Sequence, residues 1–333
     1  MGLLTLLITL LILSFLAYGI VTRTTHGKVE FKTGLALKFL KDYTGDDVLV
    51  VRKQFKKMMK TDYAKKLPIS TVDNLTIGTS QRQVPVRFYS DSDSNTVPLI
   101  IFIHGGGWCI GDLDSHDQQC RRLVKETGFA LLAVDYALSP EAKFPVALNE
   151  TVEIIMKLTS GEIDLKADTT KLAIIGDSAG GNMTITSALK LIESGDDQAI
   201  KCIVPVYPVT NCVDGKTGSF TKFSEGYILT AHLMDLFNKN YIAEGQNLKD
   251  PYLSPLFSDT LHQLPPCFVL TAAYDPLRDE GEQFADKLKS LGNQVELKRY
   301  ENCVHSFFGQ QEFGQNGLVA VKDVSTFLKK HLK

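Results

Sequence analysis

Apolar runs that alternate with helical patterns constrain the fold of this chain more than any other feature. Residues 97–103 read VPLIIFI, and such a run is typical of a strand buried on both faces of a parallel sheet. Further strands are predicted at 84–89, 129–136, 172–176, 200–206, 268–272 and 295–300. Helices are predicted at 145–158, 179–192, 280–291 and 318–332. This alternation predicts an α/β fold with a mostly parallel central sheet and helices on both faces.

An insertion of about sixty residues separates the strands at 200–206 and 268–272. It includes a helical pattern that begins at Thr230, a favoured N-cap residue. An insertion after the carboxyl end of a strand lies over the ligand crevice of such a sheet. We therefore expect one catalytic domain over residues 23–333, with a cap formed by about 28–60 and 210–248. Gly45 divides the first of these cap segments into two helices.

The composition excludes several other classes of protein. A chain of 333 residues with 44% hydrophobic and 22% charged residues is globular rather than disordered. Its formal charge of −2 gives no sign of a nucleic-acid partner. The six cysteines form no CxxC pair and no metal-ligand spacing, so the redox compartment is left open.

The amino terminus carries an uncharged segment, residues 2–21, that is long enough to cross a bilayer as a helix. It lacks a basic leading segment and a small-residue cleavage site, which argues against a cleaved signal peptide. We expect residues 1–22 to anchor the chain in a membrane, with secretion after cleavage as the alternative. Basic residues after the span favour a cytoplasmic catalytic domain, whereas sequons at Asn74, Asn149 and Asn182 favour the lumenal side. The side of the membrane stays open.

A nucleophile motif lies at one strand-to-helix junction. Residues 176–181 read GDSAGG and match G-x-S-x-G. The sharp turn lifts the hydroxyl of Ser178 clear of the sheet and requires glycine two residues to either side. Free N–H groups at the start of the following helix can stabilise a developing oxyanion. The alternative is a glycine-rich turn with an incidental serine.

A second glycine-rich segment, residues 104–108 (HGGGW), follows the strand that ends at Ile103. We call it the oxyanion loop, because three glycines let backbone N–H groups approach an anionic oxygen closely. The alternative is a flexible turn without a ligand. His104 is expected to be a structural hydrogen-bonding residue rather than a base.

A serine hydroxyl needs a histidine to take its proton and an acid to orient that histidine. In this type of fold the acid precedes the histidine. His305 lies in the loop after a strand, whereas His331 is expected to be exposed on the final helix. Asp275 directly follows a strand, whereas Asp279 and Glu280 are expected to be first-turn acids of the next helix. The predicted catalytic triad is Ser178, Asp275 and His305.

These motifs resemble those of the hormone-sensitive-lipase family of α/β-hydrolases, including its arylacetamide-deacetylase branch. The resemblance covers about residues 70–333. The matching segments are 104–108, 176–182, 275–281 (DPLRDEG) and His305. Two positions depart from the family pattern: Ala137 stands where arginine is common, and Ser306 stands where glycine is usual.

The resemblance implies a cap over the site, no metal or cofactor, and short-to-medium-chain acyl esters as substrates. Its membrane-anchored branch adds hydrophobic esters and arylamides. It also implies that the oxyanion donors are the backbone N–H groups of Gly105, Gly106, Gly107 and Ala179.

Other functions share these residues. An amidase, deacetylase, lipase or transacylase would use the same triad, so the sequence does not separate these from a carboxylesterase. A non-catalytic small-ligand receptor, such as the one in this family that lacks the histidine, is disfavoured by His305. The physiological substrate and a homodimeric state are left open.

Overall fold

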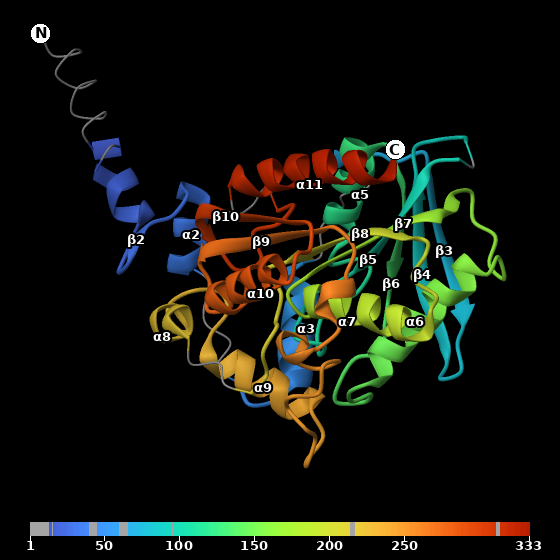
Figure 1. The fold of residues 1–333 in the computed structure, drawn as a ribbon. Coiled ribbons are helices and arrows are strands. Elements are labelled where there is room, and N and C mark those ends of the chain that lie inside the picture. Colours follow the sequence, from blue (N-terminus) through green and yellow to red (C-terminus); the bar gives the residue numbers. More distant parts are fainter. Residues whose placement is uncertain are drawn as a thin grey trace, which may run out of the picture.

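A twisted sheet with helices on both faces forms the body of the chain in the computed structural model (Figure 1). The structure describes residues 13–14, 16–39, 45–59, 66–94, 96–213, 217–310 and 314–333. The strands of the sheet are β3 Thr71–Gly78, β4 Gln83–Ser90, β5 Pro98–Ile103, β6 Ala130–Val134, β7 Asp168–Asp177, β8 Ile200–Val206, β9 Cys267–Tyr274 and β10 Val295–Val304. The α-helices are α2 Phe31–Phe39, α3 Val48–Met58, α5 Asp117–Thr127, α6 Val146–Thr159, α7 Ala179–Ser194, α8 Gly218–Phe223, α9 Ala231–Tyr241, α10 Arg278–Ser290 and α11 Asn316–Leu332. Short elements complete the set: strands β1 Arg23–Thr24 and β2 Gly27–Lys28, which pair with each other, and the 3₁₀ helices η1 Pro255–Phe257 and η2 Leu261–Gln263.

The strand order in the eight-stranded sheet is β10-β9-β8-β7-β5-β6-β4-β3. The strands from β5 to β10 pair in parallel, whereas β4 pairs antiparallel with both β3 and β6. Each strand and helix predicted above is present, with ends that differ by a few residues. The mostly parallel α/β fold predicted from the sequence is therefore confirmed.

Strand β5 shows why the apolar run is continuous. Its residues Leu99, Ile101 and Ile103 belong to one core cluster, which also includes apolar side chains of α6, α7 and α10. Ile100 and Phe102 belong to the cluster on the opposite face, beneath α5 and α11. Because alternate side chains of a strand point to opposite faces, a strand covered on both faces needs apolar residues throughout.

Helix α5 and strand β3 are among the elements that the sequence patterns did not predict, and each has a physical reason. Helix α5 buries polar side chains, among them Arg121, whose Nε donates to the Asp117 carboxylate at 2.6 Å. Its buried apolar residues are few, namely Cys120, Leu123 and Val124. Strand β3 lies at the edge of the sheet, and four consecutive residues, 73–76, are exposed. An exposed edge strand does not show the apolar pattern of a buried one.

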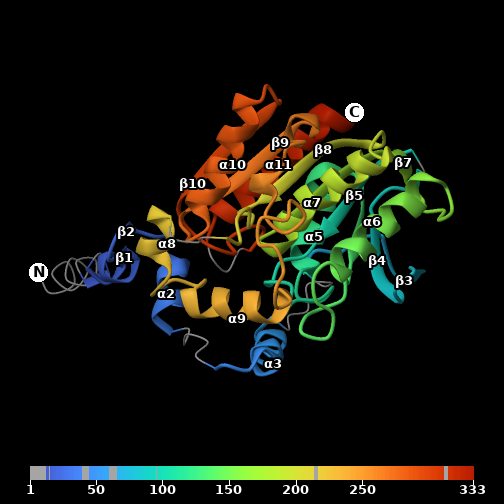
Figure 2. The same cartoon turned by 60° about the horizontal axis from the view of Figure 1, so that its bottom comes forward.

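Helices α3 and α9 lie side by side at the bottom of Figure 2. Gly45 lies between α2 and α3, as predicted. The hydroxyl of Thr230 accepts a hydrogen bond from the N–H of Leu233 at 3.2 Å and so caps α9. Apolar residues of α3 and α9 form one cluster with Cys109 and Ile110, which directly follow the oxyanion loop.

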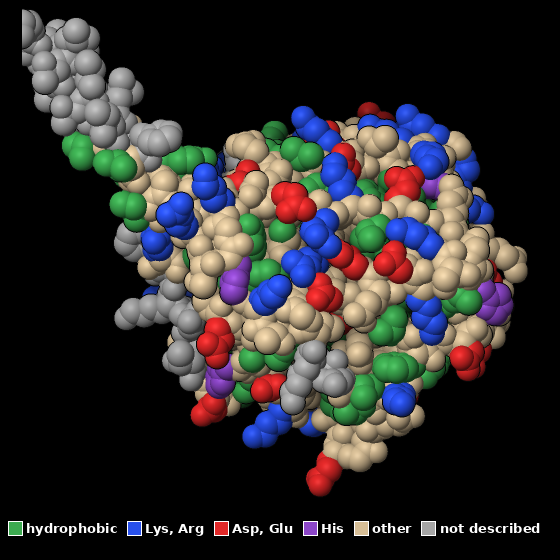
Figure 3. All heavy atoms as spheres, turned by 60° about the vertical axis from the view of Figure 1, so that its left-hand side comes forward, with side chains coloured by type: hydrophobic (Ala, Val, Ile, Leu, Met, Phe, Trp, Pro, Cys, Tyr) green, Lys and Arg blue, Asp and Glu red, His purple; other side chains and the backbone are tan. Residues whose placement is uncertain are grey.

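Most of the predicted amino-terminal anchor lies outside the described residues. Within the described part of the chain, no helix is both long and apolar enough to cross a membrane. Leu13, Leu16, Tyr18 and Ile20 are described, and each exposes more than half of its surface. Figure 3 shows this apolar stretch beside lysine and arginine side chains at the base of the amino-terminal extension.

Candidate active site

Ser178 occupies the sharp turn between β7 and α7. Its φ of 57° and ψ of −119° place it in a conformation that side chains rarely adopt. A Cβ on Gly176 would lie 2.4 Å from the Gly180 carbonyl oxygen, and one on Gly180 would lie 2.0 Å from the Ile103 carbonyl oxygen. The requirement for glycine on both sides of the serine is therefore confirmed. The turn leaves the serine hydroxyl at the carboxyl edge of the sheet.

The structure brings the three predicted triad residues together from the ends of three strands. Nε2 of His305 lies 2.9 Å from Oγ of Ser178, and Nδ1 of His305 lies 2.7 Å from Oδ2 of Asp275. Because a carboxylate only accepts, Nδ1 carries the ring proton, and Nε2 is left free to accept the serine proton. The N–H of Leu277 donates to Oδ1 of Asp275 at 2.9 Å and fixes the carboxylate. All three triad side chains are buried.

The neighbouring acids have other partners. Asp279 and Glu280 lie in the first turn of α10, as predicted. Asp279 is paired with Arg278, at 2.8 Å. Glu280 is buried and accepts from the N–H of Thr210 at 2.6 Å, so it joins α10 to the segment that follows β8. Burial raises the pKa of Glu280 to about 8. This buried role was not predicted, because Glu280 was expected only to be a first-turn acid of the helix.

One of the four predicted oxyanion donors, the N–H of Gly105, is wrong. The N–H of Gly105 donates to Oδ1 of Asp177 at 2.9 Å, so it is not available to an oxyanion. The carbonyl of Gly106 accepts from the N–H groups of two residues in the following turn, at 3.0 and 2.9 Å. Among the hydrogen bonds of the described residues, none uses the N–H of Gly106, Gly107 or Ala179. These three groups are the candidate oxyanion donors.

His104 and His331 sit in different surroundings. His104 is buried, stacks on Tyr136 with ring centroids 4.2 Å apart, and has Nδ1 2.8 Å from the carbonyl oxygen of Gly105. Burial lowers the pKa of His104 to about 4, so its ring is neutral. His331 was expected to be exposed but is half-buried, because its ring packs against Phe327 at 4.5 Å.

The two departures from the family pattern have local explanations. Ser306 has a φ of 66°, in the left-handed region where glycine is favoured, and it lines the pocket. The N–H of Ala137 donates to the carboxylate of Glu150 at 2.8 Å. That carboxylate is also paired with Arg82, which thus provides a guanidinium beside the position of Ala137.

A cavity of about 740 Å³ opens beside Ser178 and His305. Its walls are largely apolar and come from α3, α9 and the segment before α9: Val50, Phe55, Met58, Leu229, Leu233 and Phe237. The side chain of Phe237 packs so closely on the oxyanion loop that a Cβ on Gly107 would lie 2.1 Å from its ring. The cavity thus accepts an apolar group next to the serine hydroxyl.

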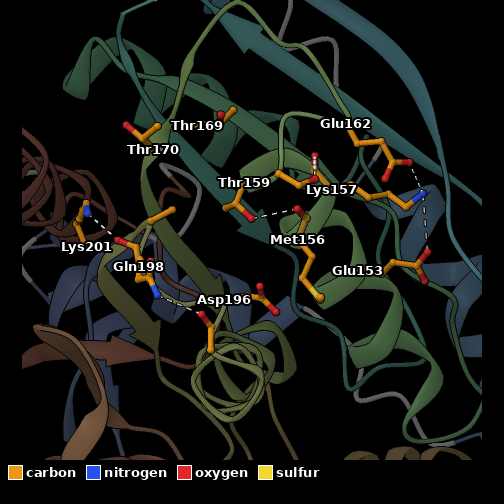
Figure 4. A pocket seen from close by; sticks show the side chains of 13 residues that line it. Glu153, Met156, Lys157, Thr159, Glu162, Thr169, Thr170, Asp196, Gln198 and Lys201 are labelled. Carbon is orange, nitrogen blue, oxygen red and sulfur yellow. Dashed lines mark hydrogen bonds and ion pairs between the residues drawn. The ribbon is translucent and has the colours of Figure 1, made fainter.

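A second hollow lies elsewhere on the molecule (Figure 4). It has a volume of about 630 Å³ and is lined by residues of α6 and of the loops around the starts of β7 and β8. Lys157 is paired there with Glu162 at 2.7 Å. None of the predicted site residues lines this hollow.

All six cysteines are described, and none forms a disulfide. Cys109, next to the oxyanion loop, is buried, and burial raises the pKa of its thiol to about 12. In the same part of the chain, no group of three or more His, Cys, Asp or Glu side chains is arranged to hold a metal ion.

This fold, with a serine, a histidine and a carboxylate hydrogen-bonded in series at its carboxyl edge, defines the class of serine hydrolases. Residues 100–309 match the family described as the alpha/beta hydrolase fold. The chain belongs to this family, which confirms the resemblance seen in the sequence.

Several relatives of the chain are esterases by name. The carboxylic ester hydrolase LipN of Mycobacterium tuberculosis is 29% identical over 294 residues, which are 86% of this chain and 77% of the relative. The arylesterase of Saccharolobus solfataricus is 32% identical over 243 residues, 73% of this chain and 78% of the relative. A solved esterase of Pyrobaculum calidifontis superposes with a TM-score of 0.80 at 36% identity, over 85% of this chain and 93% of that one.

Proposed function

We propose that the chain is a serine carboxylesterase that hydrolyses short-to-medium-chain acyl esters through an acyl-enzyme intermediate. The observation that carries the proposal is the hydrogen-bonded series from Ser178 through His305 to Asp275, with an apolar cavity at its serine end. The names of the relatives, carboxylic ester hydrolase and arylesterase, support ester hydrolysis.

In the first half-reaction, Oγ of Ser178 attacks the carbonyl carbon of the ester while Nε2 of His305 takes the hydroxyl proton. The carboxylate of Asp275 holds the imidazole and stabilises its positive charge. The negative charge on the former carbonyl oxygen is held by the N–H groups of Gly106, Gly107 and Ala179. The carbon–oxygen bond to the alcohol then breaks, and the alcohol leaves with the proton from His305.

In the second half-reaction, water attacks the acyl-serine ester while His305 takes one of its protons. The tetrahedral intermediate collapses, the carboxylic acid leaves, and the proton returns to Ser178. Each proton that His305 takes is given back, so the residues end in their starting state.

We also propose that residues 28–60 and 210–248 act as the cap that selects the substrate. Helices α3 and α9 lie in these two segments, and the two segments together supply most of the apolar residues that line the cavity. The triad residues come from other segments of the chain. Acyl and alcohol preference should therefore follow substitutions in α3 and α9.

The test is hydrolysis of p-nitrophenyl acetate, butyrate, octanoate and palmitate by the wild type and by Ser178→Ala. We expect turnover that peaks on the shorter chains and that falls by about 10⁴-fold or more in the variant. Ser290→Ala, an exposed serine at the end of α10, serves as the matched control and should keep wild-type rates. Wild-type rates in Ser178→Ala would overturn the proposal.

Membrane association through residues 2–21 is a further part of the proposal. It is supported by the uncharged sequence and by the exposed Leu13, Leu16 and Ile20, with Arg23 following directly. Flotation of the full chain with phospholipid vesicles, before and after alkaline carbonate washing, tests it. Recovery in the soluble fraction would contradict it and would favour the secreted alternative. Light scattering of the same sample distinguishes a monomer from a homodimer.

A further inference from the structure

We infer that Asp177 is a positioning residue that sets the spacing between the two halves of the oxyanion hole. This inference rests on the proposed function. One half is the N–H group of Ala179, in the turn that carries the nucleophile. The other half is the pair of N–H groups on Gly106 and Gly107. Asp177 belongs to the nucleophile turn, and its Oδ1 accepts from the N–H of Gly105 at 2.9 Å, so one hydrogen bond joins the halves.

The hydrogen bond from Gly105 to Asp177 also restrains the N–H of Gly106, because the peptide groups on both sides of Gly105 are planar. The C=O of Gly105 and the N–H of Gly106 belong to one trans peptide group, so they point in opposite directions. That C=O accepts from Nδ1 of His104 at 2.8 Å, while Asp177 holds the N–H on the other side of Gly105. Both peptide planes that meet at Gly105 are thereby fixed, and the direction of the Gly106 N–H follows from them.

The side chain of Asp177 has little room to take another position. It is buried, with 5% of its surface exposed. Nε2 of His116 lies 3.6 Å from its Oδ1, and the Tyr207 side chain lies beside its carboxyl group. A Cβ on Gly105 would lie 2.6 Å from both the carbonyl oxygen and Oδ2 of Asp177. The loop therefore rests directly on the nucleophile turn at this point, and no other residue can replace Gly105 without moving it away.

The restraint needs a hydrogen-bond acceptor at Oδ1, not a negative charge. Asp177→Asn keeps a carbonyl oxygen at this position in a side chain of the same shape, whereas Asp177→Ala removes the acceptor. Asp177→Leu removes the acceptor but keeps a side chain branched at Cγ, so it leaves no cavity, and it replaces Asp177→Ala if that variant does not fold. The comparison of these variants separates hydrogen bonding from packing and from charge.

The experiment measures kcat, KM and the inhibition constant of an alkyl trifluoromethyl ketone, whose adduct with serine places an oxyanion in the hole. We expect Asp177→Ala to lower kcat by about 10- to 100-fold and to weaken inhibition by a similar factor, because a misplaced donor acts on the oxyanion. KM should change by less than about threefold, since the ester in its ground state carries little charge. Asp177→Asn should stay within about threefold of the wild type in all three.

Thermal unfolding of each variant accompanies these measurements. If Asp177 only supports the fold, its substitution would lower Tm, but inhibition by the ketone would not weaken in proportion to the fall in kcat. This result would overturn the inference. Two further results would also overturn it: a folded Asp177→Ala or Asp177→Leu with wild-type kcat and inhibition, or an Asp177→Asn as impaired as Asp177→Ala. The proposed function fails by a different result, namely a folded wild type that hydrolyses no ester and whose Ser178 does not react with the ketone.

Discussion

The indole of Trp108 lies flat against the ring of Tyr241, with ring centroids 4.2 Å apart and planes 2° from parallel. Trp108 ends the oxyanion loop, and Tyr241 is the last residue of α9, so the stack joins the helix to the loop. Both side chains are buried. Next to the stack, Sγ of Cys109 lies 3.8 Å from the carbonyl oxygen of Phe237, also on α9. The helix that lines the cavity is thus packed against the loop that carries two candidate oxyanion donors.

Tyr241→Ala should therefore affect both stability and turnover. Loss of a buried aromatic ring leaves a cavity, and we expect the free energy of unfolding to fall by about 3–5 kcal/mol. We also expect a lower kcat at temperatures where the variant is folded, because the loop loses a support. Urea unfolding and ester hydrolysis measure the two effects. Tyr241→Phe keeps the stack and should lose less than about 1 kcal/mol; an equal loss in both variants would show that the stack is not the cause.

Asp275→Asn should reduce kcat by about 10⁴-fold while the protein stays folded. The amide nitrogen of asparagine donates, so the histidine is held with its proton on the wrong nitrogen. Asp279→Asn is the matched control, because this neighbouring acid binds Arg278 rather than His305. Its kcat should stay within about threefold of the wild type. If both variants lose activity equally, the assignment of Asp275 as the orienting acid is wrong.

Gly180→Ala should prevent the nucleophile turn from forming. The added Cβ would lie 2.0 Å from the carbonyl oxygen of Ile103, so the backbone must shift. We expect a loss of more than about 4 kcal/mol in the free energy of unfolding, or no folded protein at all. Gly195→Ala is the control, since its Cβ would meet nothing within 4 Å and only its φ of 79° is unfavourable. That variant should lose about 1–2 kcal/mol, and similar losses in the two variants would contradict the argument.

Glu280→Gln should change how stability depends on pH. Burial raises the pKa of Glu280 to about 8, from its ordinary value of 4.5. A carboxyl group with the higher pKa in the folded state favours folding at low pH, and this contribution is lost as the pH rises through that interval. Because glutamine does not titrate, the Tm of the wild type should fall relative to that of Glu280→Gln between about pH 5 and pH 8.

The control for this pH series is Glu162→Gln, a carboxylate with 60% of its side chain exposed. Its Tm should differ from the wild-type Tm by the same amount across the interval. A difference between wild type and Glu280→Gln that is independent of pH would show that the Glu280 carboxyl does not titrate there.

Much of the fold, and the grouping of Ser178, Asp275 and His305, could be predicted because short segments of sequence carry the information. The continuous run in β5 requires cover on both faces of the sheet, and Ser178, Asp275 and His305 each follow a strand at the edge where parallel strands end. The rest depends on contacts between distant residues. Nothing in the local sequence shows that the N–H of Gly105 is held by Asp177, 72 positions away. Likewise, α5 buries only three apolar residues, Cys120, Leu123 and Val124, and adds a buried polar pair between Asp117 and Arg121, so the sequence pattern did not predict it.

The cavity walls and the reacting groups are contributed by different stretches of chain. Helix α3 precedes β3, and helix α9 lies between β8 and β9. The proposed nucleophile, acid and base follow β7, β9 and β10. A substitution in α3 or at the start of α9, near Leu233, can thus alter which ester fits while the chemistry at Ser178 stays the same. The Trp108–Tyr241 stack sets a limit to this independence, because the last turn of α9 packs on the oxyanion loop. A chimaera with a relative should therefore exchange both α9 and the loop, or neither.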